Sequence, residues 1–266
     1  MAKTKRKAEK KPKKQAPIVH PCAAVIVAAG ASSRMGGKTR KPYLDLRGKP
    51  VLSWALAALA RVPGMRQIVL VTREDDRAAA KQAAKLARLP KSVKVDYADG
   101  GVRRQDSVNN GLLTTSEEIE LVLIHDGARP FPPLEAMKKA VDSAASHGGA
   151  ILAVPVRDTV KRQSKHISPH PADATHEEVL PVIYETISRA GLWLAQTPQV
   201  FRRSRLFEDF ERLSRTPELE VTDDASVLER FGHAVALIES SPVNLKITRG
   251  EDLALAEAYL KAKLVK

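Results

Sequence analysis

The chain has 266 residues, of which 43% are hydrophobic, and it carries a formal net charge of +13. This size and apolar content predict one main globular domain and exclude a fibrous or wholly disordered protein. No apolar run reaches the ~18 residues that a membrane-spanning helix needs, and no N-terminal apolar segment resembles a signal peptide, so we expect a soluble cytoplasmic protein. A single cysteine, Cys22, excludes an internal disulfide, and a buried thiol without a catalytic role is expected there.

Much of the positive charge lies at the N-terminus. Residues 1–16 hold eight Lys or Arg and one Glu, so +7 of the net charge falls there and +6 on the rest of the chain. Residues 1–17 have no apolar periodicity, and we expect a disordered, solvated tail ahead of one domain at 18–266. Weak contacts of this tail with nucleic acid or another polyanion are the alternative. The remaining charge suits an anionic small molecule.

Beyond the tail, short branched apolar runs alternate with helical segments. Strands are predicted at 22–29, 67–72, 92–98, 120–126 and 149–156, with helices near 51–61, 74–88, 103–114 and 134–147. This order is typical of an α/β fold of the Rossmann-like kind, with a mostly parallel sheet flanked by helices. Ligands bind such sheets beyond the carboxyl ends of the strands, so the residues that follow each strand are the candidate site.

The first strand end, "VAAGASSRMGGKTRKPYL" at 27–44, superficially resembles the P-loop of an ATPase. A P-loop needs a glycine five positions before Gly37, and that position is Ser32. A P-loop also begins a helix at this point, whereas Pro42 would clash with the backbone of that helix. The spacing and the proline therefore argue against a P-loop ATPase.

The same stretch offers another way to hold a nucleotide. Ala28, Ala29 and Gly30 lack bulk, so a base or phosphate can approach the backbone N–H groups closely. Arg34 and Lys41 would then bring two positive charges to the same phosphates. A surface loop with solvated basic residues is the alternative.

The third predicted strand is followed by "DGGVRRQDSVNNG" at 99–111. Gly100 and Gly101 permit a sharp turn with positive φ, and Asp106 and Ser107 stand where a helix begins. Backbone N–H groups and the Ser107 hydroxyl would be free to bind a polar ligand edge. A capped helix without a ligand is the alternative.

The fourth predicted strand ends in "IHDGARPF" at 124–131, where Asp126 leaves a buried run and Arg129 follows. A carboxylate in this position, close to nucleotide phosphates, would hold Mg²⁺ or another divalent cation. A structural pair between Asp126 and Arg129 is the alternative.

Seven motifs in a fixed order extend over residues 22–265. They read "AAGASSRM…KPYL", "GGVRRQDSV", "HDGARP", "VRDTVK", "SRAGLWLAQTPQVF", "TDDASVLE" and "NLKITRGEDL". Together they resemble the 2-C-methyl-D-erythritol 4-phosphate cytidylyltransferases of the non-mevalonate isoprenoid pathway. The resemblance implies transfer of CMP from CTP to methylerythritol phosphate with release of pyrophosphate, on a nucleotide-diphospho-sugar transferase type of fold.

The resemblance also implies roles for single residues. Arg34, Lys41, Arg189 and Lys246 would be catalytic cations, and Asp126 would lie near Mg²⁺ and substrate. The residues that resemble cytidine-binding positions are Ala28, Ala29, Gly30, Gly101 and Ser107; those that resemble positions holding the methylerythritol phosphate are Thr159, Thr197 and Thr222 together with Arg189 and Lys246.

The resemblance further implies a protruding β-arm at about 157–190 through which two subunits form a homodimer. Thr159 or Arg189 would then complete the site of the partner. The segment 162–186 is longer than expected, and its Pro, His, Ser and Asp content favours a disordered tip. His166, His170 and His176 in it match no strong zinc spacing.

Two other functions stay open from the sequence. A cytidylyltransferase for ribitol phosphate or glycerol phosphate would share the first three strand ends and differ in the later motifs. A polyanion-binding protein without catalysis would act through the basic tail, although the presence of Arg34, Lys41, Asp126, Arg189 and Lys246 together argues against it.

Overall fold

The computed structural model describes residues 19–30, 39–164, 181–216 and 218–265. The central sheet has seven strands in the order β11-β7-β10-β6-β1-β4-β5. Its strands are β1 (Cys22–Val27), β4 (Met65–Thr72), β5 (Lys94–Asp99), β6 (Leu121–Asp126), β7 (Gly149–Pro155), β10 (Trp193–Arg202) and β11 (Ala236–Glu239). The N-terminal tail and the histidines at 166, 170 and 176 lie outside the described residues.

Helices cover both faces of this sheet. They are α1 (Val51–Leu59), α2 (Arg77–Ala87), α3 (Arg104–Leu113), α4 (Leu134–His147), α5 (Arg203–Ser214), α6 (Ala225–Arg230) and α7 (Gly250–Lys261), with short 3₁₀ helices η2 (Lys41–Tyr43) and η3 (Glu74–Asp76). Within the described residues, none of the helices combines the length and apolar character needed to cross a bilayer.

Alternation along β1 divides the core into two layers. Cys22, Ala24 and Ile26 pack with residues of α1, α2 and α4, whereas Ala23 and Val25 pack with residues of α3, α5 and α6. All five side chains are fully buried. A strand covered on both faces has no polar side, which explains the continuous apolar run in the sequence.

The predicted strands and helices correspond to β1, β4, β5, β6 and β7 and to α1 through α4, so the Rossmann-like class is confirmed. β10 was not predicted from its pattern and runs antiparallel to both β6 and β7. Its pairing with β7 shifts register between Ala195 and Gln199. Such an irregularity redirects side chains, and here it lies beside the carboxyl end of β6.

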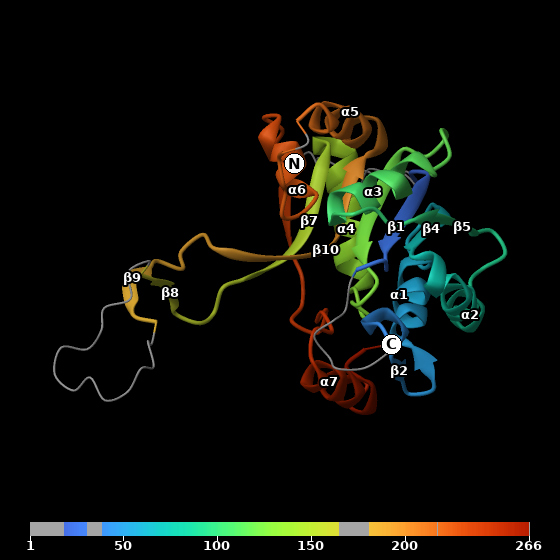
Figure 1. Cartoon of the computed structure of the whole chain (residues 1–266), viewed down its shortest axis with the longest axis horizontal. Coiled ribbons are helices and arrows are strands. Elements are labelled where there is room, and N and C mark those ends of the chain that lie inside the picture. Colours follow the sequence, from blue (N-terminus) through green and yellow to red (C-terminus); the bar gives the residue numbers. More distant parts are fainter. Residues whose placement is uncertain (1–18, 31–38, 165–180, 217, 266) are drawn as a thin grey trace, which may run out of the picture.

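The segment after β7 leaves the body of the molecule. Strands β8 (Val160–Gln163) and β9 (Ile183–Ile187) form an antiparallel pair separate from the main sheet. Figure 1 shows this pair at the end of an arm that extends far from the helices and the central sheet. Residues 165–180, between the two strands, lie outside the described part.

A smaller layer holds the C-terminal helix. Strands β2 (Asp45–Leu46) and β3 (Lys49–Pro50) pair with each other, and Leu46, Phe131, Ile247 and Ala256 join them to α7 in a third apolar cluster. η2 precedes this hairpin and contains Pro42 in its first turn, where proline is compatible with helix geometry. Through Phe131 and Ile247, this cluster joins the loop after β6 to the segment before α7.

Cys22 is expected to be unreactive in the native protein. Its side chain is fully buried, its thiol donates to the carbonyl of His20 at 3.2 Å, and burial together with the charge of Glu120 raises its pKa to about 12. Because the thiolate is the reactive species, iodoacetamide at pH 8 should leave the native chain unmodified and should alkylate it fully in urea. Mass spectrometry measures this, with glutathione as the reactive control. Rapid alkylation of the native chain would contradict the burial of Cys22.

Candidate active site

A pocket of about 390 Å³ opens beyond the carboxyl ends of β1 and β6. We call it the first pocket. Its lining includes seven residues predicted from the sequence, namely Ala28, Ala29, Gly30, Lys41, Ser107, Asp126 and Lys246. A Cβ built on Gly30 would meet no atom of the described residues within 4 Å, so none of these residues fills the space beside it. The small residues at the end of β1 therefore form a wall that a flat or anionic ligand can approach closely.

The turn between β5 and α3 packs tightly against the first pocket. A Cβ on Gly100 would lie 2.3 Å from the Cβ of Ala29, and a Cβ on Gly101 would lie 2.4 Å from the Cβ of Asp106. Neither glycine has a positive φ, so the prediction of a positive-φ turn was wrong. Close packing is what requires glycine at both positions.

The hydroxyl of Ser107 supports this turn. It accepts a hydrogen bond from the backbone N–H of Gly101 at 2.9 Å and donates to the carbonyl of Arg103 at 3.2 Å. The expectation of a free hydroxyl was therefore wrong. One lone pair of the hydroxyl remains for a ligand, since only one of its two acceptor positions is used.

Asp126 stands at the end of β6 among three cations. Its carboxylate lies 2.8 Å from the ammonium of Lys246 and 3.6 Å from the guanidinium groups of Arg104 and Arg129. Burial alone would raise the pKa of Asp126, but the charges of Lys246, Arg104 and Arg129 hold it well below its ordinary value. The predicted pair between Asp126 and Arg129 is present as one part of this cluster.

Arg104 anchors the cluster to a second carboxylate. Its guanidinium forms two hydrogen bonds to Asp224, at 3.0 and 2.8 Å, and the Asp224 side chain is almost fully buried. A bidentate pair of this kind fixes the plane of the guanidinium. Arg104 is thereby held where it also faces Asp126.

A buried polar chain fixes the backbone of Asp126. The ring of His125 contacts the Arg129 carbonyl through Nε2 at 3.0 Å and the Thr197 hydroxyl through Nδ1 at 3.1 Å. Since a carbonyl only accepts, Nε2 carries the proton, and the hydroxyl donates to Nδ1 and accepts from the N–H of Asp126 at 3.1 Å. Burial lowers the pKa of His125 to about 4, which keeps the ring neutral.

Thr197→Val is expected to destabilise the protein by about 1–3 kcal/mol, because it leaves the N–H of Asp126 and the Nδ1 of His125 without a buried partner. Urea denaturation at constant m measures the loss. Thr72→Val is the matched control, since the buried Thr72 hydroxyl has no hydrogen-bond partner to lose. Equal midpoints for the two variants would show that the chain through Thr197 contributes nothing.

A second pocket, of about 290 Å³, lies beside the first. The predicted substrate-binding residues Thr197 and Thr222 line it. Both pockets share three lining residues, Arg104, Asp126 and Lys246. The carboxylate of Asp126 and two of its cations therefore stand at the boundary between two ligand-sized spaces.

The loops around this boundary are tied together through Asn244. Its carbonyl accepts from the Arg129 guanidinium at 2.8 Å, and its buried side-chain amide donates to Gln196 and to the carbonyl of Thr197, both at 2.9 Å. Asn244 lies two residues before Lys246. These bonds position the ammonium of Lys246 relative to β6 and β10.

Four predicted site residues line neither pocket in the part of the chain that the structure describes. One is Gly101, which adjoins the first pocket only through its hydrogen bond to Ser107. Arg34 lies outside the described residues. Thr159 and Arg189 are exposed residues of the arm that flank β8 and β9, and neither lines either pocket. The Arg189 guanidinium donates to the carbonyl of Arg157. Thr159 directly precedes β8 and Arg189 follows β9, and Figure 1 shows these two strands at the end of the arm, away from the central sheet.

Sequence reasoning missed several residues of the site. Arg104, Asp224, His125 and Asn244 were not candidates, although all four lie within the motifs quoted above. The only local signal was two charged pairs, "RR" at 103–104 and "DD" at 223–224, and neither identifies its partner.

The fold and the paired pockets define an α/β nucleotide-binding enzyme of the Rossmann-like class, with small residues at the end of β1 and cations around a central carboxylate.

Comparison with known proteins narrows this class. The profile of the 2-C-methyl-D-erythritol 4-phosphate cytidylyltransferase family matches residues 22–262. The enzyme of that name from Pelotomaculum thermopropionicum is 38% identical over 241 residues, which cover 91% of this chain and 94% of the relative. The chloroplastic enzyme of Oryza sativa is 36% identical, over 90% of this chain and 74% of the relative.

Solved structures agree with the sequence comparisons. The structure of a 4-diphosphocytidyl-2C-methyl-D-erythritol synthase from Anaerococcus prevotii superposes with a TM-score of 0.74 at 29% identity, covering 91% of this chain and 96% of that chain. The chain therefore belongs to the 2-C-methyl-D-erythritol 4-phosphate cytidylyltransferase family.

Proposed function

We propose that this chain transfers CMP from CTP to 2-C-methyl-D-erythritol 4-phosphate, giving 4-diphosphocytidyl-2-C-methyl-D-erythritol and pyrophosphate for isoprenoid precursor biosynthesis. The observation that carries the proposal is the position of Asp126, Arg104 and Lys246, which line two adjoining pockets at once. A nucleotide in the first pocket and a polyol phosphate in the second would meet beside these three groups.

The first pocket suits a nucleotide triphosphate. The backbone at Ala28, Ala29 and Gly30 is open to a base or sugar, and the turn at Gly101 holds Ser107 beside it. Lys41 lines the same pocket, and its ammonium has no hydrogen bond or ion pair with another described residue. This ammonium is a cation available to the α-phosphate, where negative charge grows during attack.

No general base is needed for the attack. The second pKa of a phosphate monoester is about 6, so the acceptor is already mostly a dianion at neutral pH. His125 is unsuited to that role, because both ring nitrogens are engaged and burial lowers its pKa to about 4. Catalysis here is therefore positioning and charge compensation.

Charge compensation is the main task of the site. Two like charges 4 Å apart in an effective dielectric of ~20 repel by about 4 kcal/mol, and two polyanions bring several such pairs. Lys41 supplies positive charge from the first pocket, Arg129 from the second, and Lys246 and Arg104 from the boundary. Arg34 is expected to act with Lys41 on the phosphates.

Mg²⁺ is part of the proposal, with Asp126 as its protein ligand. The described residues contain no group of three or more His, Cys, Asp or Glu that could enclose a metal. A single carboxylate ligand nevertheless fits Mg²⁺, which commonly binds one or two carboxylates together with substrate phosphates and water. When bound, the ion would neutralise phosphate charge, while Lys246 and Arg104 keep the Asp126 carboxylate ionised and oriented.

The test is pyrophosphate release by the purified protein with CTP and Mg²⁺. Methylerythritol phosphate, ribitol phosphate and glycerol phosphate are compared as acceptors, and chain lacking residues 1–16 is assayed in parallel. We expect release only with methylerythritol phosphate and equal rates with and without the tail. Pyrophosphate release with ribitol phosphate or glycerol phosphate alone would support the nucleotide site but contradict methylerythritol phosphate as the acceptor. No release with any of the three acceptors would favour the polyanion-binding alternative.

We further propose that the arm forms a homodimer in which Arg189 and Thr159 serve the site of the partner subunit. A lone two-stranded sheet is marginally stable in water, and this one exposes Ile183 (64% exposed) and Tyr184 (69% exposed). Sedimentation should give a dimer for the native chain. The double variant with Ile183→Glu and Tyr184→Glu should be monomeric and inactive.

Mixing two inactive variants tests the arrangement in trans. If Arg189 acts across the dimer, refolding Lys41→Ala together with Arg189→Ala yields mixed dimers with one intact site, and about a quarter of native activity returns. If Arg189 acts within its own chain, every site lacks one of the two cations and activity stays absent. Restored activity is the expected result.

A further inference from the structure

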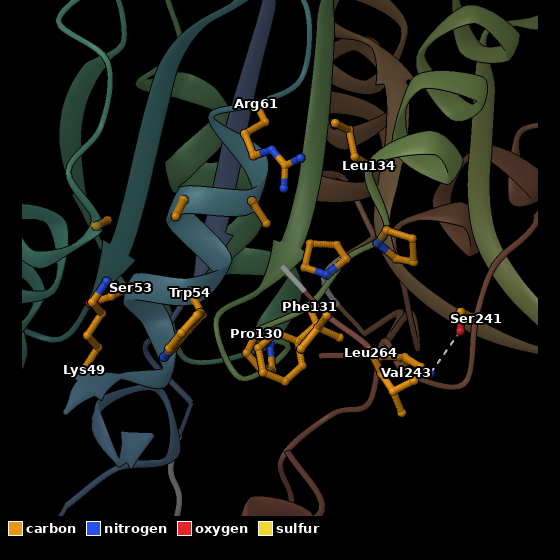
Figure 2. A pocket seen from close by; sticks show the side chains of 16 residues that line it. Lys49, Ser53, Trp54, Arg61, Pro130, Phe131, Leu134, Ser241, Val243 and Leu264 are labelled. Carbon is orange, nitrogen blue, oxygen red and sulfur yellow. Dashed lines mark hydrogen bonds between the residues drawn. The ribbon is translucent and has the colours of Figure 1, made fainter. Parts of the chain in front are cut away.

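A third pocket, of about 460 Å³, lies between α1 and the loop that follows β6 (Figure 2). We call it the aromatic pocket. Its lining residues come from β3, from α1 and the turn after it, from the end of α2 and from residues 130–134. Ser241, Val243, Leu264 and Val265 complete the lining. It shares no lining residue with the two pockets of the active site. Its size falls within the roughly 300–1,000 Å³ typical of small-molecule sites.

Two aromatic rings form a fixed wall of the aromatic pocket. Trp54 and Phe131 meet edge to face, with ring centroids 6.0 Å apart and planes at 75°. The indole N–H of Trp54 donates to the carbonyl of Leu46 at 3.0 Å, and the ammonium of Lys49 lies 5.3 Å from the centre of the Trp54 ring. These contacts fix the orientation of the indole. The pocket therefore offers a preformed apolar surface to a flat ligand.

The charge of the lining is entirely positive. Lys49 and Arg61 are its charged residues, and none of the sixteen lining residues is acidic. Arg61 is exposed just beyond the end of α1, and its side chain has no hydrogen bond or ion pair with another described residue. In Figure 2 its guanidinium points from α1 toward the side where Leu134 lies. An apolar wall with a free guanidinium at one end complements an anion with an apolar body.

We propose that the aromatic pocket binds a small amphipathic anion, with a flat apolar body against Trp54 and Phe131 and a sulfonate, phosphate or carboxylate group at Arg61. The ligand is a compact molecule, since the pocket admits no more than a few rings. Its occupancy changes the turnover of the active site.

The walls of the aromatic pocket continue into the active-site loops. Pro130 directly follows Arg129, and Val243 directly precedes Asn244. The two loops are joined between the pockets by the bond from Arg129 to the Asn244 carbonyl at 2.8 Å and by the bond from the Ile247 N–H to the Ala128 carbonyl at 2.9 Å. A ligand that contacts both walls changes the distance between these two loops. That change in turn moves Lys246 relative to Asp126.

Fluorescence titration with 8-anilinonaphthalene-1-sulfonate tests the binding. N-phenyl-1-naphthylamine has the same rings without the sulfonate and is the matched neutral probe. We expect saturable binding of one sulfonate per chain that CTP does not displace. Arg61→Ala should weaken it about three- to fivefold, as for an exposed ionic contact, and should leave binding of the neutral probe unchanged. Arg66→Ala, which removes an exposed arginine lining none of the pockets described, is the charge control.

Ala58→Phe fills the aromatic pocket from α1 and should abolish binding of both probes while leaving the far-ultraviolet circular dichroism unchanged. Binding that survives this variant, or that CTP displaces, overturns the site. In the pyrophosphate assay, saturating sulfonate should change kcat of the native chain at least about twofold and leave Ala58→Phe unaffected. Binding without any change in kcat would contradict the coupling between the aromatic pocket and the active site. The fluorescence titration measures binding independently of the proposed transfer reaction.

Discussion

Lys41→Ala should lower kcat by about 10²–10³-fold while changing the KM for CTP far less. Lys41 lines the first pocket, and its ammonium has no partner among the described residues, so its charge is available to the reacting phosphate. Removal of one group that stabilises developing charge typically costs this much in kcat. Steady-state kinetics with CTP and methylerythritol phosphate measures both parameters.

Two further variants test whether the fall in kcat of Lys41→Ala comes from the lost positive charge. Lys41→Arg keeps the positive charge and should recover part of the rate. Lys91→Ala removes an exposed lysine that lines none of the pockets described and should behave as the native enzyme. Comparable losses in kcat and in CTP affinity for Lys41→Ala would assign this residue to binding alone.

Asp126→Asn should lower both activity and stability. Turnover is expected to fall by about 10²–10³-fold, because the residue at the boundary of both pockets loses the charge that orients Lys246 and Arg104. The free energy of unfolding at pH 7 should fall by about 1–3 kcal/mol. This is less than the 3–5 kcal/mol of a fully buried pair, since the Lys246 side chain is 45% exposed.

The stability loss should depend on pH in one direction. The three cations hold the pKa of Asp126 below its unfolded value of about 3.9, so the carboxylate stabilises the native state above that pH, and this contribution is lost as the pH falls further. In metal-free buffer, urea denaturation at a series of pH values should show the native chain and Asp126→Asn converging below about pH 4. Asp142→Asn, at an exposed aspartate of α4, is the control. A constant difference between pH 7 and pH 3 would contradict the ion cluster.

Much of the first pocket could be predicted because its residues are local in sequence. Ala28, Ala29 and Gly30 follow β1 directly, and Asp126 ends β6, so each can be placed by finding the strand that precedes it. The acceptor side could be placed only through the ordered motifs, because Thr197 and Thr222 stand beside Asp126 through the antiparallel β10 and the loop before α6. β10 itself gave no clean apolar signal, since Gln196, Thr197 and Gln199 interrupt it.

Local patterns in the amino-acid sequence are enough to place the layers of this protein. Cys22 to Val27 form a buried strand because every side chain there is apolar and small enough to pack under helices on both faces. The apolar periodicity of α2 and α4 likewise indicates an amphipathic helix. Local interactions between residues a few positions apart suffice for these assignments.

Only the tertiary structure decided which polar groups meet. Arg104 pairs with Asp224 across 120 positions, and Thr197 meets His125 across 72 positions. Such partners depend on the order of strands in the sheet and on the irregular pairing of β10, which no local pattern contains. Once the apolar layers pack, partners are favoured for the polar groups carried to one edge of the sheet, because a buried group left alone costs about 1–3 kcal/mol.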